Sequence, residues 1–545
     1  MKLKIPHTFV IVASILLLCG ILTWIIPAGE FTRGIKVVDG VEREVIIDGS
    51  YHLVERAPQS WQILGSVVDG FKKQSGIIAF ILIIGGAFWL LSATNAINFG
   101  ISSFLEKSKK WENKKFLRGF GSNNIIIIGC MLCFSLFGAI FGMSEETIAF
   151  VIIIVPLAIS MGYDSITGLL MVYVAAHIGF SGAMFNPFTI GIAQGISGVP
   201  IFSGFEYRFV VWLVVTTLII LFTLYYAKKV KKDPKSSPTY EIDSFWREKT
   251  LTTSQSPDNK CEGYSTDNKI ENTKATLKTY IVYITISIIL IISAIYHPKM
   301  ILTIGNLSGN FICLPIVAAL FLLLGFITIR KGTLSFILNI LTFTILILII
   351  GVLGYGWYVS EIATLFIAMG IFSTLAAGWK SDKIAKEFIL GAKDILSAAL
   401  VVGLAGGIIE ILTNGKILDT ILYSLASAME GSGKSGGLGA MYGIQTFLNI
   451  FIPSGSAKAA LTMPIMAPFS DMIGISRQAT VLAFQLGDGF TNMITPTSGV
   501  LIGALGAARI PYSLWVKWFW KILLVFIVIG FLLLLPTIIF NIPGF

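Results

Sequence analysis

The 545-residue sequence has little charge and few of the residue types that build active sites in soluble proteins. Only 13% of its residues are charged and 55% are hydrophobic, with four histidines and five cysteines. This composition excludes an ordinary soluble protein. The sequence also lacks a nucleotide-binding glycine loop, a metal-spaced His/Cys cluster and a nucleophile elbow. It therefore predicts neither an enzyme nor a protein that needs a cofactor or a metal.

Basic residues are in excess, but their placement does not suit nucleic acid. The formal net charge of +10 comes from lysines and arginines between apolar segments, which is typical of loops beside a lipid bilayer. Cys130 and Cys133 have the spacing of a redox motif but lie in an apolar run, so we expect them to pack as apolar side chains. The apolar runs predict an all-α polytopic membrane protein with about eleven transmembrane helices.

Two segments have a different pattern, in which short apolar arms flank a polar tip. Each arm is shorter than the stretch of about 20 residues that crosses a bilayer. Polar, non-helical backbone is tolerated at membrane depth only where it lines a cavity or is buried in protein. We therefore predict two re-entrant hairpins, with arms Gly129–Phe141 and Ile148–Met161 around the tip Gly142–Thr147, and arms Met441–Ile452 and Ala457–Ala467 around the tip Ser454–Ser456.

Each predicted hairpin is followed by a long apolar span that proline interrupts. These spans are Thr167–Gly195, broken near Pro187, and Ala479–Ala508, broken near Pro496. The two prolines are 309 positions apart, and the serines that open the two tips are 310 positions apart. A repeat over half the chain, with broken helices at matching places, is typical of a secondary transporter.

The distribution of basic residues orients the two halves of the chain. Lysines follow the span Phe205–Ala227, and Glu106–Arg118 holds six basic and two acidic residues, so both regions should be cytoplasmic, like the N-terminus. Counting crossings then inserts the first hairpin from the cytoplasm and the second from outside, which makes the halves an inverted-topology repeat. The predicted organisation is a first half over 1–232, a linker over 233–278 and a second half over 279–545.

Smaller segments complete the prediction. The linker is rich in Ser, Thr, Asn, Lys and Pro, so we expect it to be cytoplasmic and disordered. Alternating Val and Ile residues over Lys36–Ile47 predict a small β-hairpin on the outer side. The amphipathic segment Ala385–Lys393 predicts a helix on the inner surface. Ile417–Met429 is too short to cross, and glycine-rich Glu430–Leu438 predicts an outer loop.

The first hairpin tip carries two adjacent acids between apolar arms. An acidic group at membrane depth is costly and marks a functional site by default. We expect Glu145 or Glu146 to hold a cationic substrate or to accept a proton, and a close pair to share one proton. The alternative is a salt bridge to a neighbouring helix or a position at the inner surface. The candidate residues at this tip are Ser144, Glu145, Glu146 and Thr147.

The second tip suits a carboxylate. A helix N-terminus, two hydroxyls and a lysine are the groups that bind anions in proteins. The alternative for Lys458 is that its side chain extends to the outer surface. If both tips reach the midplane, the site has an acidic side and a carboxylate-binding side, which fits a zwitterionic or cationic amino acid. The candidate residues are Ser454, Gly455, Ser456 and Lys458.

The broken spans add further polar groups. Proline frees a backbone carbonyl, and nearby polar side chains supply oxygens to a substrate or an ion, unless they only re-satisfy the kinked backbone. Asp488 is a second carboxylate candidate, for a proton or a substrate ammonium, against an interhelical hydrogen bond. His177 and Glu410 are lone polar groups in apolar runs. The candidates at the breaks are Asn186, Thr189, Asn492, Thr495, Thr497 and Ser498.

Four segments together resemble the YfcC-type family of basic amino acid antiporters. They are KIPHTFV…WIIPAGEF at the start, GMSEET, SGSAKAALTMPIMAP and GDGFTNMITPTSG. This family is similar to the C4-dicarboxylate anaerobic carriers and belongs to a wider ion-transporter superfamily. The resemblance implies an inverted repeat of scaffold and transport domains, a homodimer in the inner (cytoplasmic) membrane, and exchange of arginine for ornithine.

The chain departs from the divalent-anion branch of that superfamily, whose tips read Ser-Asn-Thr and bind carboxylate and sodium. Here the matching tips read Ser-Glu-Glu-Thr from Ser144 and Ser-Gly-Ser-Ala from Ser454. The added acid argues against a dianionic substrate at the first tip, and the loss of an Asn carbonyl at each tip weakens the case for sodium sites.

These observations favour a secondary transporter that exchanges arginine for ornithine by alternating access. The first alternative is a C4-dicarboxylate or other organic-anion carrier coupled to sodium or protons. An alternative from a different class is an ion channel, although two closed hairpins that enter from opposite faces fit alternating access better than an open pore.

Overall fold

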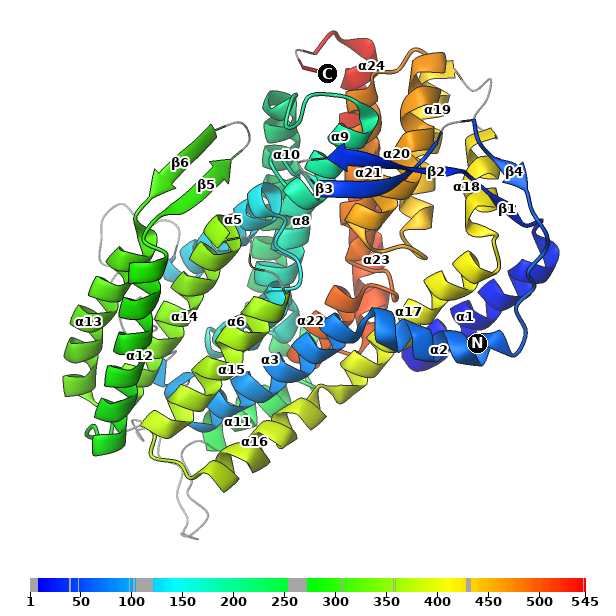
Figure 1. Cartoon of the computed structure of the whole chain (residues 1–545). Coiled ribbons are helices and arrows are strands. Elements are labelled where there is room, and N and C mark those ends of the chain that lie inside the picture. The colour runs from blue at the N-terminus through cyan, green and yellow to red at the C-terminus, as the bar shows by residue number, and fades with distance from the viewer. Residues whose placement is uncertain are drawn as a thin grey trace.

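The computed structural model describes residues 8–38, 41–47, 49–97, 99–100, 103, 121–252, 272–304, 307–355, 357, 359–427, 433–542 and 544–545. Within these residues the fold is almost entirely helical, with three small two-stranded sheets (Figure 1). Nine described helices are long and apolar enough to cross a membrane. The all-α polytopic class is therefore confirmed. The prediction of eleven spans stays a prediction, because five further described apolar helices are shorter than a full span.

The first half begins with a helix, two small strand pairs and two helices that meet end to end. The hairpin, the broken span and a long return helix follow. In chain order the elements are α1 (Thr8–Ile25), β1 (Gly29–Glu30), β2 (Arg33–Val38), β3 (Val41–Ile46), β4 (His52–Leu53), α2 (Gln62–Lys73), α3 (Ser75–Ala93), α5 (Ser122–Phe141), α6 (Thr147–Ser160), α7 (Ser165–Leu169), η2 (Leu170–Val174), α8 (Ala175–Ser181), η3 (Pro187–Gly191), α9 (Ile192–Ser197) and α10 (Phe205–Lys232).

Over its described residues, the rest of the chain consists of further helices and one strand pair. In chain order the remaining elements are η4 (Pro234–Ser236), α11 (Ser244–Thr252), α12 (Leu277–Tyr296), β5 (Met300–Ile304), β6 (Leu307–Phe311), α13 (Cys313–Lys331), α14 (Thr333–Tyr355), α15 (Val359–Ala376), α16 (Ser381–Asp394), α17 (Leu396–Asn414), α18 (Leu418–Ser427), α19 (Gly433–Leu448), α20 (Gly455–Met472), α21 (Arg477–Asn492), α22 (Gly499–Ala508), α23 (Tyr512–Leu534) and α24 (Pro536–Ile539).

Two amphipathic helices, α2 and α16, each pack along a long helix from the other half of the chain. Helix α2 packs along α17, and α16 packs along α3. Glycine permits the close approach: a Cβ added to Gly70 would lie 2.3 Å from the backbone nitrogen of Gly407, and one added to Gly391 would lie 2.7 Å from the carbonyl oxygen of Gly85. Small residues at helix contacts are typical of membrane bundles. The predicted amphipathic helix over 385–393 is part of α16.

Both predicted hairpins are present as helix–turn–helix units, and both predicted breaks are confirmed. The first hairpin is α5–α6, and its span breaks between α8 and η3; the second hairpin is α19–α20, and its span breaks between α21 and α22. Helix α5 packs along α8, and α19 packs along α21. Across the halves, α9 packs on α20 and α22 packs on α6, so the two units interlock near the middle of the molecule (Figure 1).

The first arm of each hairpin is longer than predicted. Helix α5 begins at Ser122 instead of Gly129, and α19 begins at Gly433 instead of Met441. The predicted outer loop Glu430–Leu438 is therefore wrong from Gly433 onward; its first residues lie outside the described part. Glycine has low intrinsic helix propensity, and packing of α19 against α21 overrides that preference here.

The strand pair β2–β3 confirms the predicted β-hairpin. Strands β2 and β3 pair antiparallel from Arg33 opposite Ile46 to Val38 opposite Val41, and the turn residues between them lie outside the described part. Hydrogen bonds to the Asp419 carboxylate attach this region to α18: the Phe31 backbone N–H donates at 3.0 Å, and the Arg33 guanidinium donates to both oxygens at 3.0 and 2.9 Å. A second strand pair, β5–β6, joins α12 to α13.

The prediction of a disordered linker is wrong for its first 20 residues. Residues 233–252 fold into η4 and α11. The backbone N–H of Ser165 donates to the Asp243 carboxylate at 3.1 Å, and the Trp246 indole donates to the Ala508 carbonyl at 3.3 Å. Composition misleads here because one buried tryptophan, 6% exposed, anchors an otherwise polar segment. Residues 253–271, like the predicted basic loop over 104–118, lie outside the described residues.

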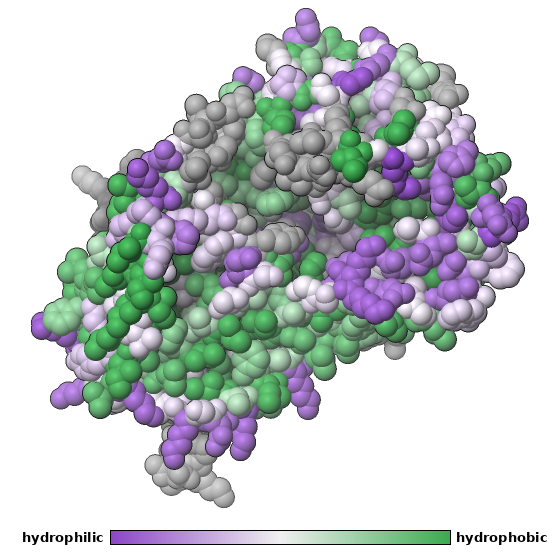
Figure 2. Space-filling view, in the orientation of Figure 1, coloured by the Kyte–Doolittle hydropathy of each residue, from purple (hydrophilic) through white to green (hydrophobic). Residues whose placement is uncertain are grey.

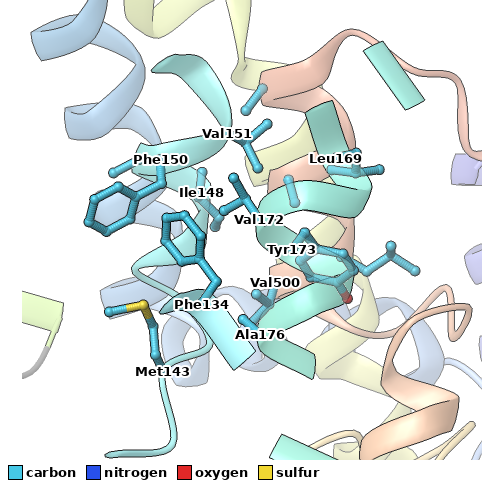
Figure 3. Packing of buried hydrophobic residues seen from close by; sticks show 14 of the residues in the cluster. Phe134, Met143, Ile148, Phe150, Val151, Leu169, Val172, Tyr173, Ala176 and Val500 are labelled. Carbon is cyan, nitrogen blue, oxygen red and sulfur yellow. The ribbon is translucent and has the colours of Figure 1, made fainter. Parts of the chain in front are cut away.

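Large apolar side chains hold the first hairpin closed. Phe134 of α5 and Phe150 of α6 meet edge to face, with ring centroids 5.0 Å apart (Figure 3). Val151 and Leu169 extend this contact to the broken span, and all four side chains are buried. In a bilayer, close van der Waals packing of such side chains holds helices together, so the two arms and the span form one packed body.

Hydrophobic side chains also cover much of the outside. They gather over α12 and α13 and along the lower face near α15, whereas hydrophilic side chains cluster over α2 (Figure 2). On α12, Ile281, Ile288 and Ile295 are each about half exposed or more. An apolar surface this large is not stable in water and fits contact with lipid. The protein is therefore a multi-pass membrane protein.

Candidate functional site

One cavity of about 240 Å³ is lined by both hairpin tips and both broken spans. Its remaining wall comes from α17 and from Gln74, the residue between α2 and α3. Figure 2 shows the surface hollowed beside α2. A larger cavity of about 430 Å³ lies between α12, α14 and α15, but its lining is mostly apolar. The smaller cavity is therefore the candidate site, because ligand sites need convergent polar groups.

The structure brings most of the predicted site residues to this cavity. Those that line it are Ser144, Glu145, Glu146, Thr189, Ser454, Gly455, Ser456, Asn492, Thr497 and Ser498. Five other predicted residues are buried behind the lining: Thr147, Asn186, Lys458, Asp488 and Thr495. The contact of any of these residues with a substrate stays a prediction.

At the first tip, an acidic side chain accepts a hydrogen bond from the backbone of its own turn. The carboxylate of Glu146 accepts a hydrogen bond from the Ser144 N–H at 3.0 Å, and the side chain is 5% exposed. Thr147 donates its hydroxyl proton to the Ser144 carbonyl at 2.5 Å. Glu146 also precedes the first residue of α6, where the helix dipole favours a negative charge. Glu145 is half-buried and lines the cavity.

A glycine and an asparagine join the first tip to its broken span. Gly142 ends α5 with a positive φ of 70°, and an added Cβ would lie 2.4 Å from Oδ1 of Asn186. The same Oδ1 accepts a hydrogen bond from the Phe188 N–H at 2.9 Å. Asn186 therefore caps η3, in which proline supplies no N–H at the first position. Asn186 acts as a structural contact between the tip and the break.

The second tip presents the N-terminus of α20 to the cavity. The Ser454 hydroxyl accepts a hydrogen bond from the Ala457 N–H at 3.5 Å, and it lies 3.4 Å from the Ser456 hydroxyl. Gly455 is the first residue of the helix. An added Cβ there would lie 2.7 Å from the Thr189 methyl carbon and 3.0 Å from Oδ2 of Asp488. The tip thus lies directly on both broken spans.

Lys458 and Asp488 form a fully buried ion pair beneath this tip. Nζ of Lys458 lies 2.8 Å from Oδ1 of Asp488, and neither side chain is exposed. The alternative in which Lys458 extends to the outer surface is therefore wrong. Its ammonium is neutralised inside the protein, because the Asp488 carboxylate on α21 lies against the turn of α20 that carries the lysine.

Two amides complete a polar network around this pair. The Lys458 ammonium donates to Oδ1 of Asn449 at 2.9 Å and to the Gln445 carbonyl at 3.2 Å. The Asn449 amide donates to Oδ1 of Asn492 at 3.0 Å, and the Asn492 amide donates to Oδ2 of Asp488 at 3.2 Å. Asn492 also lines the cavity, so the network reaches from the buried pair to the cavity wall.

His177 lines the cavity on the first broken span. Its Nδ1 lies 3.0 Å from the Tyr173 carbonyl oxygen. A carbonyl oxygen only accepts, so Nδ1 carries the proton and Nε2 is an acceptor in the neutral ring. The Tyr173 hydroxyl donates to the Asn492 carbonyl at 2.9 Å, which connects this span to the second break.

Three residues of the site are absent from the sequence prediction. Gln74 separates α2 from α3 and lines the cavity. Gln445 and Asn449 lie in or beside a predicted apolar arm. The available signal was an amide side chain within an apolar run, which is as informative at membrane depth as a charged one. Among the described residues, no group of three or more His, Cys, Asp and Glu side chains could hold a metal ion.

A family model described as "C4-dicarboxylate anaerobic carrier" (DcuC) matches residues 5–539. The chain belongs to this family. Like other members of the C4-dicarboxylate anaerobic carrier family, it is a membrane carrier of small molecules. A relative from Escherichia coli (strain K12), named "Putative basic amino acid antiporter YfcC", is 32% identical and covers 94% of this chain and 92% of the relative. The expected family resemblance is thus confirmed.

Other similar proteins are more distant from this carrier. An uncharacterized protein of Haemophilus influenzae (strain ATCC 51907 / DSM 11121 / KW20 / Rd) is 26% identical over 98% of this chain and 97% of its own. Among solved structures, the YdaH transporter of Alcanivorax borkumensis is 14% identical, with a TM-score of 0.38 over 99% of this chain and 100% of that chain. MtrF of Neisseria gonorrhoeae, from a class of antimetabolite efflux pumps, is 15% identical, with a TM-score of 0.37 over 99% and 97%.

Proposed function

We propose that this carrier is an antiporter that exchanges basic amino acids, arginine for ornithine. One observation carries the proposal: of the described residues that line the cavity, only Glu145 and Glu146 are acidic, and none is Lys or Arg. The nearby lysine, Lys458, is paired with Asp488 outside the cavity. A cavity lined by carboxylates, with no lysine or arginine among its described lining residues, attracts a cation and repels an anion.

The tips have separate roles in this proposal. Glu145, which is half-buried in the cavity wall, binds the guanidinium or side-chain ammonium, and Glu146 adds negative potential from behind. The N-terminus of α20, with the hydroxyls of Ser454 and Ser456, binds the substrate carboxylate. Phe180 and Phe188 also line the cavity and offer ring faces to a cation.

The relatives support amino-acid exchange and also define the competing function. The Escherichia coli relative is named "Putative basic amino acid antiporter YfcC", whereas the family is described as a C4-dicarboxylate anaerobic carrier. A dicarboxylate would bring two negative charges against Glu145 and Glu146 with no lysine or arginine among the described lining residues. That electrostatic cost favours the amino acid.

We further propose that the two hairpins are re-entrant and belong to an inverted repeat that gives alternating access. The crosswise packing of α2 on α17 and α16 on α3, and of α9 on α20 and α22 on α6, supports this relation. Exchange without net movement follows if the empty cavity, with two carboxylates in its lining and no bound cation, resists changing sides. A transport cycle of this kind needs no catalytic group, so the protein is not an enzyme.

The orientation in this proposal places the N-terminus in the cytoplasm of a cell with the protein in its inner membrane. Lysines close α10, and Arg330 and Lys331 close α13, which matches the excess of basic residues on the cytoplasmic side. The organisation into halves over 1–232 and 279–545 and assembly as a homodimer belong to the same proposal. Arginine, ornithine and the bilayer are its expected partners.

Counterflow tests the proposal directly. Proteoliposomes loaded with ornithine should take up labelled arginine, while empty proteoliposomes should take up almost none. Unlabelled succinate outside should not compete. Melting of the purified carrier should be raised by arginine or ornithine and not by succinate, since ligands stabilise the state they bind. Stabilisation or counterflow by succinate alone would reject the amino-acid assignment, and large unitary currents in bilayer recordings would reject the carrier mechanism in favour of a channel.

A further inference from the structure

The ammonium of Lys458 is enclosed by oxygen atoms from two neighbouring elements. It donates hydrogen bonds to Oδ1 of Asn449 at 2.9 Å and to the carbonyl of Gln445 at 3.2 Å, and it forms an ion pair with Oδ1 of Asp488 at 2.8 Å. An ammonium has three N–H donors, and three oxygen atoms thus surround it in this cage. The side-chain amide of Gln445 is buried and without a hydrogen-bond partner among the described residues.

The cage lies where a carrier would hold a free cation. Gln445 and Asn449 lie at the C-terminal end of α19, which stops at Leu448, and the cage lies beneath the first turn of α20. In transporters, the C-terminal ends of half-length helices and unwound carbonyls near the midplane are the groups that coordinate coupling cations. In this protein the cation at that position is the Lys458 ammonium, which is covalently part of the hairpin.

The second hairpin alone has this arrangement. By the spacing of 310 between the tips, the residue that matches Lys458 is Ile148, and by the spacing of 309 between the breaks, the residue that matches Asp488 is Gly179. Ile148 is fully buried among apolar side chains. The pair is therefore an addition to one half, and its function concerns that half.

We propose that the Lys458 ammonium replaces a coupling cation: it holds the α19–α20 hairpin in its substrate-binding form, so that exchange needs no sodium or potassium ion at this tip. This inference rests on the proposed transport function and assigns its ion dependence. A free cation would have to bind before the tip could close. A tethered one is always present, and the network through Asn492 transmits its position to the cavity wall.

The wild-type carrier gives the first test. Ornithine-loaded proteoliposomes should take up arginine at the same rate, within about 20%, in sodium chloride, potassium chloride or choline chloride of equal ionic strength. Without substrate, the melting temperature should differ by less than about 1 °C among the three salts. Exchange that falls several-fold in choline chloride would overturn the proposal. If arginine exchange is absent in every salt, the proposed function is rejected. The comparison of melting temperatures among the three salts then tests the ion-dependence proposal by itself.

Removal of the tethered charge gives the second test. Lys458→Met keeps the apolar stem but ends one atom before the ammonium position, so it leaves an anionic cage with room for an alkali-metal cation. The variant, purified in sodium chloride, should melt at least about 3 °C higher in sodium or potassium chloride than in choline chloride. The matched control, Lys458→Met with Asp488→Asn, has a neutral cage and should show no difference among the salts.

The outcomes separate the possible roles of Lys458. A salt response in Lys458→Met that disappears in the double variant supports the proposal. An equal response in both variants, or none in either, shows that the cage holds no alkali cation and overturns it. A Lys458→Met variant that cannot be recovered folded from either sodium or potassium chloride also counts against it, because a free cation should then substitute for the ammonium.

Discussion

The two hairpin tips face one cavity but treat charge in opposite ways. At the first tip, the acids are part of the lining, and Glu146 is held by the N–H of its own loop. At the second, the charged residues are buried below the lining and pair with each other, and only hydroxyls and helix N–H groups reach the cavity. The first hairpin thus places its acidic residues in the cavity lining, whereas the charged residues at the second hairpin neutralise each other below the lining.

This difference shows that the charge of a site depends on pairing as much as on composition. The two hairpin tips and the buried part of α21 hold one lysine and three carboxylates, namely Lys458, Glu145, Glu146 and Asp488, which is a net charge of about −2. Because Lys458 and Asp488 neutralise each other, all of that net charge lies on the two glutamates at the first tip. Pairing therefore decides where the negative charge lies, and the proposed preference for a cation rests on its position in the cavity lining.

The largest effect is expected from removal of the Asp488 carboxylate, which neutralises Lys458 at the second tip. Asp488→Asn leaves the Lys458 ammonium, which is 0% exposed, without its carboxylate. Removal of one member of a buried ion pair costs about 3–5 kcal/mol, because the remaining charge is uncompensated. The variant should therefore melt far below the wild type in detergent and lose exchange.

Its matched control is Asp488→Asn combined with Lys458→Met. This double variant has no buried charge, so it should recover most of the lost melting temperature, as neutral replacements of buried ion pairs often do. If both variants melt like the wild type, the pair is not coupled in the folded protein.

The origin of that pair also marks the limit of prediction from sequence. The hairpins, the two breaks and the β2–β3 hairpin followed from local patterns, namely interrupted apolar runs and residue alternation, and the structure contains them. The pairing of Lys458 with Asp488 spans 30 positions and two helices, and no local pattern specifies it. The sequence therefore identified both residues as functional candidates but placed the lysine against a substrate carboxylate.

The linker shows the same limit in another form. Disorder was predicted from average composition, but Trp246 and Asp243 make specific contacts with Ala508 and Ser165. Contacts between segments so far apart in the chain depend on which surfaces the fold leaves available. Composition cannot report them, because one buried anchor hardly changes a mean over 46 positions from 233 to 278.

The second prediction sharpens the comparison within the first tip. Glu145→Gln should weaken arginine binding by about 2–3 kcal/mol, the worth of a hydrogen bond to a charged group, and reduce counterflow at low arginine about 30–160-fold. Glu146→Gln should lower the melting temperature more than it lowers affinity, because Glu146 accepts the Ser144 N–H at the start of α6. Concentration dependence of uptake and thermal melting measure the two effects.

The contrast between these isosteric variants is itself the control. Unchanged uptake by Glu145→Gln and Glu146→Gln removes both carboxylates from the substrate site. If the two variants have equal effects on uptake and on melting, the tip acts as one unit. In that case Glu145 and Glu146 do not divide substrate binding and stabilisation of the tip between them.

The third prediction concerns the turn that presents the first tip. Gly142→Ala places a Cβ at a positive φ of 70° and 2.4 Å from Oδ1 of Asn186, so it should cost about 2 kcal/mol or more. The matched control is Gly129→Ala on the same helix, where an added Cβ meets nothing within 4 Å. That variant should melt at or slightly above the wild type. Equal melting of the two variants would show that the Gly142 turn is not fixed by Asn186.

The smallest effect is expected at the second tip, where no charge reaches the cavity. Ser454→Ala removes the acceptor of the Ala457 N–H and should cost about 1 kcal/mol, as loss of a helix N-cap does. Ser454→Gly should cost only a few tenths of a kcal/mol in stability, yet it removes the same hydroxyl from the cavity. If Ser454 also binds the substrate carboxylate, both variants should weaken arginine uptake to a similar extent while only Ser454→Ala melts lower. Uptake that follows melting temperature across the pair would instead show that the hydroxyl only caps α20, and that the backbone N–H groups alone hold the carboxylate at this tip.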